Sequence, residues 1–399
     1  SARIPASLSE AARKALNLPH PAFETPDEIR AAWREAGERN APEFDSWTRR
    51  VAALPPERRR LLDRLREGKL PEGWEAPLRA FRDEAARSGR AQSGIALSGE
   101  LVDRLADAIP ELLSGAPDLE GATQHKRKLK AFTAEDQGGR YVHYGIREHA
   151  MGAMMNGMAA HGGVVPVGVT YLVFSDYLRP VLRLAAMMGL PVPFVFSHDS
   201  VGIGRNGPTH QPVEYLASLR AIPNMLVLRP ADAVEAAECW EIALDTRTGP
   251  SSLIFARQAL LAVRRDGSGE NRSARGAYVL EEATGPRRVT LLATGSEVAL
   301  AVEARRRLEE EGIPTAVVSM PSWELFERQD AAYRREVLGP GTVRVGVEAA
   351  VRLGWDRYLG EDGGFVGMSG FGASGAEADL ARHFGLTPER VVEEVRARL

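Results

Sequence analysis

The α/β character of the chain is clearest in the stretch PFVFSHDSVGIGRNGPTHQP, residues 193–212. It opens with an apolar run of the length of a buried strand, and a polar, glycine-rich loop follows at once. Open α/β sheets bind ligands at the carboxyl ends of their strands, which is where this loop begins. His198 and His210 bracket the loop and can donate hydrogen bonds or move protons. Either histidine alone could be a capping residue, but two in one glycine loop favour a site.

Similar apolar runs lie on both sides of this stretch, and helical patterns alternate with them. Between residues 92 and 262 the alternation is typical of a parallel sheet with crossover helices. Residues 264–271 are a candidate polar linker. From residue 275 the alternation starts again, and its first strand ends in Thr294-Gly295-Ser296-Glu297. We therefore predict two parallel-sheet α/β domains. The expected strands lie at 164–171, 193–196, 225–228 and 252–256 in the first, and at 289–292, 315–320, 343–347 and 364–368 in the second.

The N-terminal segment differs from the rest in charge. Residues 1–90 carry 33 charged side chains, whereas residues 151–200 carry four. A helix start is indicated by Thr25 as the cap, Pro26 at the first helical position and acidic residues behind them. Because so charged a segment can bury little of itself, we predict exposed helices without a core of their own.

Composition restricts the class of protein. The 399 residues contain 51 Lys and Arg against 54 Asp and Glu, which supplies no broad basic field for nucleic acid or anionic lipid. No apolar run reaches the roughly 18 to 20 residues of a membrane span, and residues 1–5 contain no hydrophobic signal core. The single cysteine, Cys239, excludes a disulfide framework and a cysteine-built metal site. We expect a soluble, cytoplasmic protein with no nucleic-acid or membrane partner.

A second candidate cluster is Tyr144–Met151, where polar side chains enter a helix of small and apolar residues. Burial of the Glu148 carboxyl would favour its protonated form and suit it to hold or pass a proton. Alternatively, Glu148 pairs with Arg147 or caps the helix. Spacing alone supports both interpretations equally.

Aromatic residues and an arginine complete the candidate set. Tyr171, Phe174 and Tyr177 are spaced three apart and so lie on one side of a helix or turn. They are either ordinary core or a platform for a flat heteroaromatic ring. Arg257 directly follows an expected strand, where a guanidinium could bind an anion.

Taken in order, these clusters resemble transketolase. Residues 145–151, 198–212, 257–258 and 320–326 carry the resemblance, which is collinear from about residue 15 to the end. Transketolases use thiamine diphosphate to move a two-carbon ketol unit between sugars. The resemblance implies three parts: residues 1–85 as the helical tail after a diphosphate-binding domain, 86–265 as a pyrimidine-binding domain and 272–399 as the C-terminal domain.

The resemblance also implies roles for single residues. Glu148 would hydrogen-bond a ring nitrogen of the aminopyrimidine and promote its imino tautomer. Asp118 would lie near the cofactor at the subunit boundary. His198 and His210 would contact the substrate and take part in catalysis. The aromatic pocket around the pyrimidine would be Tyr171, Phe174 and Tyr177, and the remaining sugar contacts would be Asn206 and Arg257.

The family's metal–diphosphate motif, Gly-Asp-Gly followed by Asn about thirty residues later, is absent from the chain. The resemblance therefore implies that a partner subunit with the diphosphate-binding domain holds the cofactor's Mg²⁺ or Ca²⁺. A homodimer of this chain within a heterotetramer, a split transketolase, would be the active form. Two alternatives are a C-terminal fragment of a single-chain transketolase and a non-catalytic regulatory partner of one. A 2-oxoacid dehydrogenase beta component is disfavoured by residues 198–212 and 320–326. Gly202-Ile203-Gly204 lacks the full dinucleotide-binding spacing.

Five positions depart from the family pattern. Ile95, Ala122 and Asn206 stand where the family usually has Arg, Ser and Asp, and Arg205 occupies a usually acidic position. Gly370 replaces a usual Arg. A lost guanidinium removes a strong contact to a phosphate. We therefore expect a sugar or modified sugar substrate unlike the usual pentose phosphates.

Overall fold

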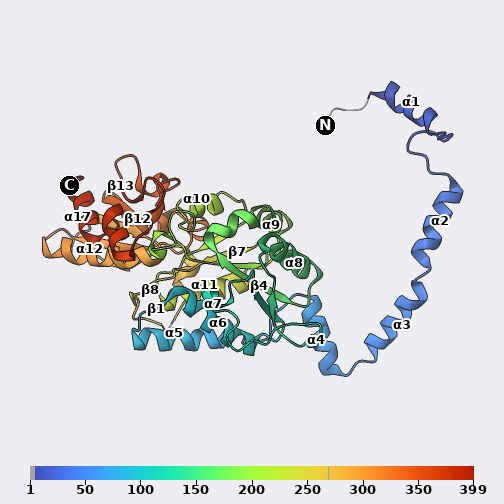
Figure 1. Cartoon of the computed structure of the whole chain (residues 1–399), viewed down its shortest axis with the longest axis horizontal. Coiled ribbons are helices and arrows are strands. Elements are labelled where there is room, and N and C mark those ends of the chain that lie inside the picture. Colours follow the sequence, from blue (N-terminus) through green and yellow to red (C-terminus); the bar gives the residue numbers. More distant parts are fainter. Residues whose placement is uncertain (1–4, 268) are drawn as a thin grey trace. The chain divides into compact units, whose positions relative to one another are not determined.

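The computed structural model describes residues 5–267 and 269–399 (Figure 1). Contacts divide the chain into two units, Ser1–Glu67 and Gly68–Leu399. In the described residues no helix is long and apolar enough to cross a membrane. The predicted division at 1–85, 86–265 and 272–399 stays a prediction.

The smaller unit consists of short helices, as its charge predicts. No residue of the four helices that the structure describes there is buried, which confirms the expectation of exposed helices for this part of residues 1–90. The rest of that segment departs from the expectation, because helix α5 (Ala76–Ser88) buries Leu78 and Phe81 in the core of the larger unit. The predicted capping role of Thr25 is wrong. The helix begins at Asp27, after Pro26, and no side chain caps its first turn. The helices are α1 (Ala6–Ala15), α2 (Asp27–Glu38), α3 (Ala41–Ala52) and α4 (Pro56–Arg66).

The first sheet of the larger unit has six strands, all parallel, in the order β3-β2-β4-β5-β7-β6. The predicted parallel sheet is confirmed. Because every strand runs the same way, all the carboxyl ends lie along one edge of the sheet. The strands are β2 (Leu112–Ala116), β3 (Tyr141–His143), β4 (Val165–Tyr171), β5 (Pro193–Ser197), β6 (Leu226–Leu228) and β7 (Ser251–Ile254).

Helices cover both faces of this sheet (Figure 1). In β5, Val195 packs in the core beneath α5, α6 and α11, whereas Phe194 and Phe196 pack beneath α8, α9 and α10. This alternation is the two-residue period of a strand buried on both sides. The helices are α5 (Ala76–Ser88), α6 (Gly94–Ala108), α7 (Glu120–Thr123), α8 (Glu148–His161), α9 (Ser175–Met188), α10 (Tyr215–Arg220) and α11 (Ala233–Asp245); β1 (Gln92–Ser93) pairs with β8 (Ala259–Leu260) in a short antiparallel ribbon.

The second sheet has the order β13-β12-β10-β11-β9. The four predicted strands are parallel, and β9 joins β11 at the edge in the antiparallel direction. This second α/β layer confirms the predicted fold class with one antiparallel edge strand added. The strands are β9 (Tyr278–Glu281), β10 (Val289–Ala293), β11 (Thr315–Ser319), β12 (Val343–Val351) and β13 (Gly364–Met368); the helices are α12 (Val298–Glu310), α13 (Trp323–Glu327), α14 (Ala331–Leu338), α15 (Asp356–Leu359), α16 (Glu377–Phe384) and α17 (Pro388–Arg396).

Buried polar contacts join the two α/β layers at α11. Glu235 accepts hydrogen bonds from the Tyr278 hydroxyl at 2.5 Å and the Ser319 hydroxyl at 2.6 Å. Glu238 pairs with Arg264 at 2.8 Å and accepts from the Ser273 hydroxyl at 2.7 Å. Buried carboxylates need such partners, so the contacts hold the two layers in one arrangement.

Candidate functional site

The candidate residues follow the carboxyl ends of neighbouring strands of the parallel sheet. Along the sheet, Glu148 follows β3, Asp118 follows β2, Tyr171 ends β4, His198 follows β5 and Arg257 follows β7. Parallel strands present these ends at one edge, so residues spread over 140 positions of sequence share one side of the domain.

His198 is held in a strained conformation at this edge. Its backbone has φ of +58°, which is uncommon for a residue with a side chain. Its imidazole stacks on the Tyr171 ring, with centroids 3.6 Å apart, and its Nδ1 lies 2.9 Å from the Ser197 hydroxyl. Burial, with the nearby charge of Arg257, lowers the pKa of His198 to about 4. The imidazole is therefore neutral at pH 7 and can donate or accept a hydrogen bond.

The three predicted aromatic residues form a continuous row. The ring centroids of Tyr171 and Phe174 lie 5.6 Å apart, and those of Phe174 and Tyr177 lie 5.9 Å apart. His210 meets Phe174 edge-on at 5.8 Å. The row runs from the end of β4 through a short 3₁₀ turn, Leu172–Phe174, into α9. Tyr177 is 61% exposed, so the row opens to the outside and is not ordinary core.

Glu148 is the first residue of α8 and is 7% exposed. Within the part of the chain that the structure describes, its carboxyl has no hydrogen bond or ion pair. Arg147 instead donates to the Tyr144 carbonyl at 3.0 Å, and no side chain caps the helix. Neither structural alternative for Glu148 is therefore found. Although the residue is largely buried, its carboxyl oxygens are not enclosed by protein, so they are free to bond a ligand at this edge.

The glycine loop and Arg257 line a cavity of about 360 Å³ together with residues 375–377. Arg205 and Asn206 are exposed at its rim, and Arg257 approaches the Ile203 carbonyl at 3.4 Å. Within the described chain neither arginine has an ion-pair partner. Glu377 lines the same cavity. Burial raises the pKa of its carboxyl, and the positive charge of Arg257 partly offsets this rise. The cavity suits an anionic group.

The other candidates lie in different surroundings. Asp118 is exposed, with φ of +58°, one residue beyond Pro117. Ala122 lies in α7 and is partly exposed. Ile95, in contrast, is 2% exposed within the core beneath α6. Its side chain belongs to the core of this chain and not to an open pocket.

Sequence reasoning missed the residues that fasten the loop to the second layer. The Gln211 amide nitrogen donates to the Gly204 carbonyl at 2.8 Å and to the Ala373 carbonyl at 2.9 Å. The Ser374 hydroxyl donates to the Arg205 carbonyl at 2.9 Å. The contacts that involve Ala373 and Ser374 join residues 162 and 169 positions apart, so no spacing within the loop could indicate them.

Two models of known protein families match the chain. Residues 91–262 match the transketolase pyrimidine-binding domain, and residues 276–387 match the transketolase-like C-terminal domain. The chain belongs to the transketolase family. Transketolase from Sinorhizobium medicae is 50% identical over 388 residues, which are 96% of this chain and 55% of that protein. Transketolase from Geobacillus stearothermophilus is 44% identical over 94% of this chain and 57% of its own.

Solved transketolase structures share the fold. A Pichia stipitis transketolase complex with sedoheptulose 7-phosphate has a TM-score of 0.87 and 34% identity, over 95% of this chain and 56% of that one. The structure of a split-gene transketolase, an inactive beta4 tetramer, covers 77% of this chain and 99% of its own, with a TM-score of 0.64 and 24% identity. The present chain thus spans a little over half the length of the curated relatives that it matches.

Proposed function

We propose that the chain is the pyrimidine-binding and C-terminal component of a thiamine-diphosphate-dependent transferase that moves a two-carbon ketol unit between sugars or sugar-like substrates. The observation that carries the proposal is the unpartnered carboxyl of Glu148, a largely buried residue whose carboxyl oxygens are not enclosed by protein. It shares a sheet edge with an open aromatic row and two histidines. Family membership supports this use of the site.

The donor set fits the pyrimidine end of the cofactor. The Glu148 carboxyl can form a hydrogen bond with a ring nitrogen, and the row from Tyr171 to Tyr177 offers a flat apolar surface for the ring. Thiamine diphosphate, when bound, supplies a reactive thiazolium carbon that carries the ketol unit. Asp118 would lie near the cofactor, at the boundary between this chain and its partner subunit. The described residues contain no group of three or more His, Cys, Asp and Glu side chains that could hold a metal ion, and Mg²⁺ or Ca²⁺ would be held by a partner subunit.

The substrate would lie against the glycine loop. Neutral His198 would present Nε2 to the substrate, because its Nδ1 is engaged by the Ser197 hydroxyl. Nε2 donates to a sugar oxygen in the tautomer whose Nδ1 accepts from Ser197, and accepts from a sugar hydroxyl in the other tautomer. His210, fixed edge-on against Phe174, would hold or move a proton near the reacting oxygens. Asn206 would contact a sugar hydroxyl, and Arg257 would bind an anionic end of the substrate.

The chain would act with a diphosphate-binding subunit, as a homodimer within a heterotetramer. A solved structure of similar fold comes from a split-gene transketolase, and this supports the proposed division. Two alternatives remain: the C-terminal fragment of a single-chain transketolase, supported by the single-chain relatives, and a non-catalytic regulatory partner.

Reconstitution tests the proposal. The chain is mixed with the part of the Sinorhizobium medicae relative that it does not cover, thiamine diphosphate and Mg²⁺, and ketol transfer is measured over phosphorylated and unphosphorylated ketoses. We expect transfer by the mixture and none by either part alone. Transfer lost in Glu148→Gln would separate a catalytic role from a regulatory one. Cofactor binding without any transfer would overturn the catalytic proposal, and the intact mass of the native protein distinguishes subunit from fragment.

A further inference from the structure

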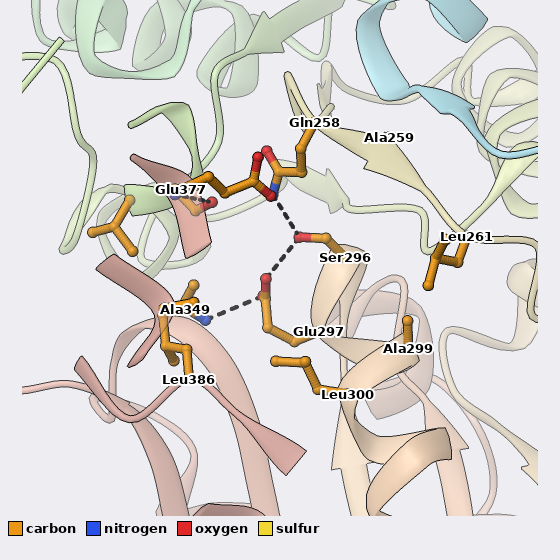
Figure 2. A pocket seen from close by; sticks show the side chains of 14 residues that line it. Gln258, Ala259, Leu261, Ser296, Glu297, Ala299, Leu300, Ala349, Glu377 and Leu386 are labelled. Carbon is orange, nitrogen blue, oxygen red and sulfur yellow. Dashed lines mark hydrogen bonds between the residues drawn. The ribbon is translucent and has the colours of Figure 1, made fainter. Parts of the chain in front are cut away.

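One carboxylate of the second α/β layer is linked to both arms of the candidate substrate site. Figure 2 shows the first arm. The Gln258 amide nitrogen donates to the Ser296 hydroxyl at 3.2 Å, and this hydroxyl donates to Glu297 Oε1 at 2.7 Å. Gln258 is the immediate neighbour of Arg257. The Glu297 carboxylate is therefore connected to the anion-binding side of the site.

The second arm starts at the other oxygen of the same carboxylate. Glu297 Oε2 accepts from Arg229 Nη1 at 2.5 Å and from the Ala349 amide at 3.1 Å. Arg229 Nη2 in turn donates to Asp199 Oδ2 at 2.6 Å. Asp199 is the residue after His198, whose φ is +58°. A non-glycine residue keeps such a backbone only where its surroundings over-determine it.

Burial and a glycine turn hold Glu297 against Arg229. Arg229, Asp199 and Glu297 are all at least 96% buried, and buried charge-assisted hydrogen bonds are strong and directional. Gly295 has φ of +59°, and a Cβ there would lie 2.5 Å from Cζ of Arg229. Only glycine at this position lets the guanidinium reach past the turn to Glu297 and to the Thr294 carbonyl, 2.8 Å away.

We infer that Glu297 is a positioning residue through which the C-terminal layer sets His198 and Arg257 relative to each other. The inference rests on the proposed function, in which these two side chains contact the substrate. It assigns the Thr294–Glu297 turn a task in substrate recognition, although none of its residues lies on the parallel sheet that carries the site.

Kinetics of the reconstituted enzyme give the first test. Glu297→Gln keeps the side-chain shape but removes the charge that Arg229 shares, and we expect KM for the ketol donor to rise about tenfold while kcat changes less than about threefold. Glu238→Gln is the matched control. Glu238 is an equally buried carboxylate that pairs with Arg264, in the segment that connects the two layers, and has no bond to a neighbour of a site residue. The Glu238→Gln substitution should destabilise the fold without changing KM.

Titration of His198 in the isolated full chain gives a test that needs no activity. With ¹³C-labelled histidine, assigned by His198→Asn, NMR should show His198 titrating well below the ordinary histidine pKa of about 6.5. Loss of a nearby negative charge alone would lower its pKa further. A loosened loop would admit solvent and move Arg257 away, so repositioning in Glu297→Gln should raise it by at least about one pH unit. The sign separates the two causes.

A second variant covers failure of Glu297→Gln to fold. Ser296→Ala breaks only the Gln258 arm, so KM should rise about threefold while the His198 titration stays in place. Its control, Ser319→Ala, removes another buried hydroxyl that donates to a glutamate, Glu235, at 2.6 Å. If the variants and their controls behave alike in KM and titration, the inference is wrong. If titration responds but no ketol transfer is found, the positioning role holds and the proposed function fails.

Discussion

Glu148 is the residue on which the chemistry depends most directly. Glu148→Gln should keep the fold and most cofactor affinity in the reconstituted enzyme, because the amide fills the same space. Turnover should fall by about 10²- to 10⁴-fold, the usual contribution of a group that transfers a proton. Steady-state kinetics at saturating thiamine diphosphate measure this. Retention of more than about half the activity would remove Glu148 from the mechanism.

His198 should make the stability of the chain depend on pH. Burial and the charge of Arg257 hold its pKa at about 4 in the fold, against about 6.5 in an unfolded chain. Between pH 6.5 and pH 4, His198 therefore binds a proton in the unfolded state but not in the folded state. Stability is therefore complete above pH 6.5 and is lost as the pH falls toward 4, by about 2 kcal/mol at pH 5.

Urea unfolding at pH 7 and pH 5 checks this prediction. His198→Asn removes the titrating group, so the variant should lose less stability between the two pH values than the native chain. His125, buried with a pKa lowered to about 3, acts in the same direction and is unchanged in both proteins. Equal losses in the two proteins would show that His198 is protonated as easily in the fold as outside it.

Helix α7, through Ala122, and the glycine loop, through Asn206, should decide substrate preference. Ordinary ketose phosphates should be poor substrates with raised KM, because Ala122 and Asn206 lack the hydroxyl and carboxylate usual in the family. Ala122→Ser with Asn206→Asp should improve use of xylulose 5-phosphate, which KM measurements on the reconstituted enzyme will show. Arginine at Ile95 is a poor test because Ile95 is buried in the core of this chain, where an unpaired charge is destabilising. Ordinary efficiency of the unmodified enzyme with this sugar would contradict the prediction.

The fold of the elements was largely predictable. The runs at 193–196 and 364–368 have strand length and apolar composition, and they are strands β5 and β13. The antiparallel edge strand β9 was not expected. It has only four residues, and Tyr278 is the one among them that is buried. The cap at Thr25 was wrong because helix α2 starts after Pro26 without any side-chain bond.

Assembly is the prediction for the whole molecule. Helices α8 and α9 expose large apolar side chains, among them Met154, Leu184, Met187 and Met188, each between 46% and 65% exposed. Such a cluster indicates an interface, and an obligate one should bury well above ~2,000 Å². We expect at least a homodimer of the isolated chain in sedimentation analysis, with no tight thiamine diphosphate binding by calorimetry until the diphosphate-binding part is added. Met187→Glu should weaken the dimer, which sedimentation analysis of the variant measures. Tight cofactor binding by the isolated chain would refute the shared site.

The sequence by itself determined the local features of this protein. Apolar runs specify strands, and the histidines of the glycine loop and the spacing of Tyr171, Phe174 and Tyr177 place chemistry at strand ends, because these patterns are written in neighbouring residues. Only the tertiary structure decided which distant groups meet. Ile95 entered the core, and Glu297 came to lie against Arg229 and, through it, Asp199. Such contacts join residues about 30 to 70 positions apart, and their geometry follows from how two sheets and their helices pack, which no local pattern encodes.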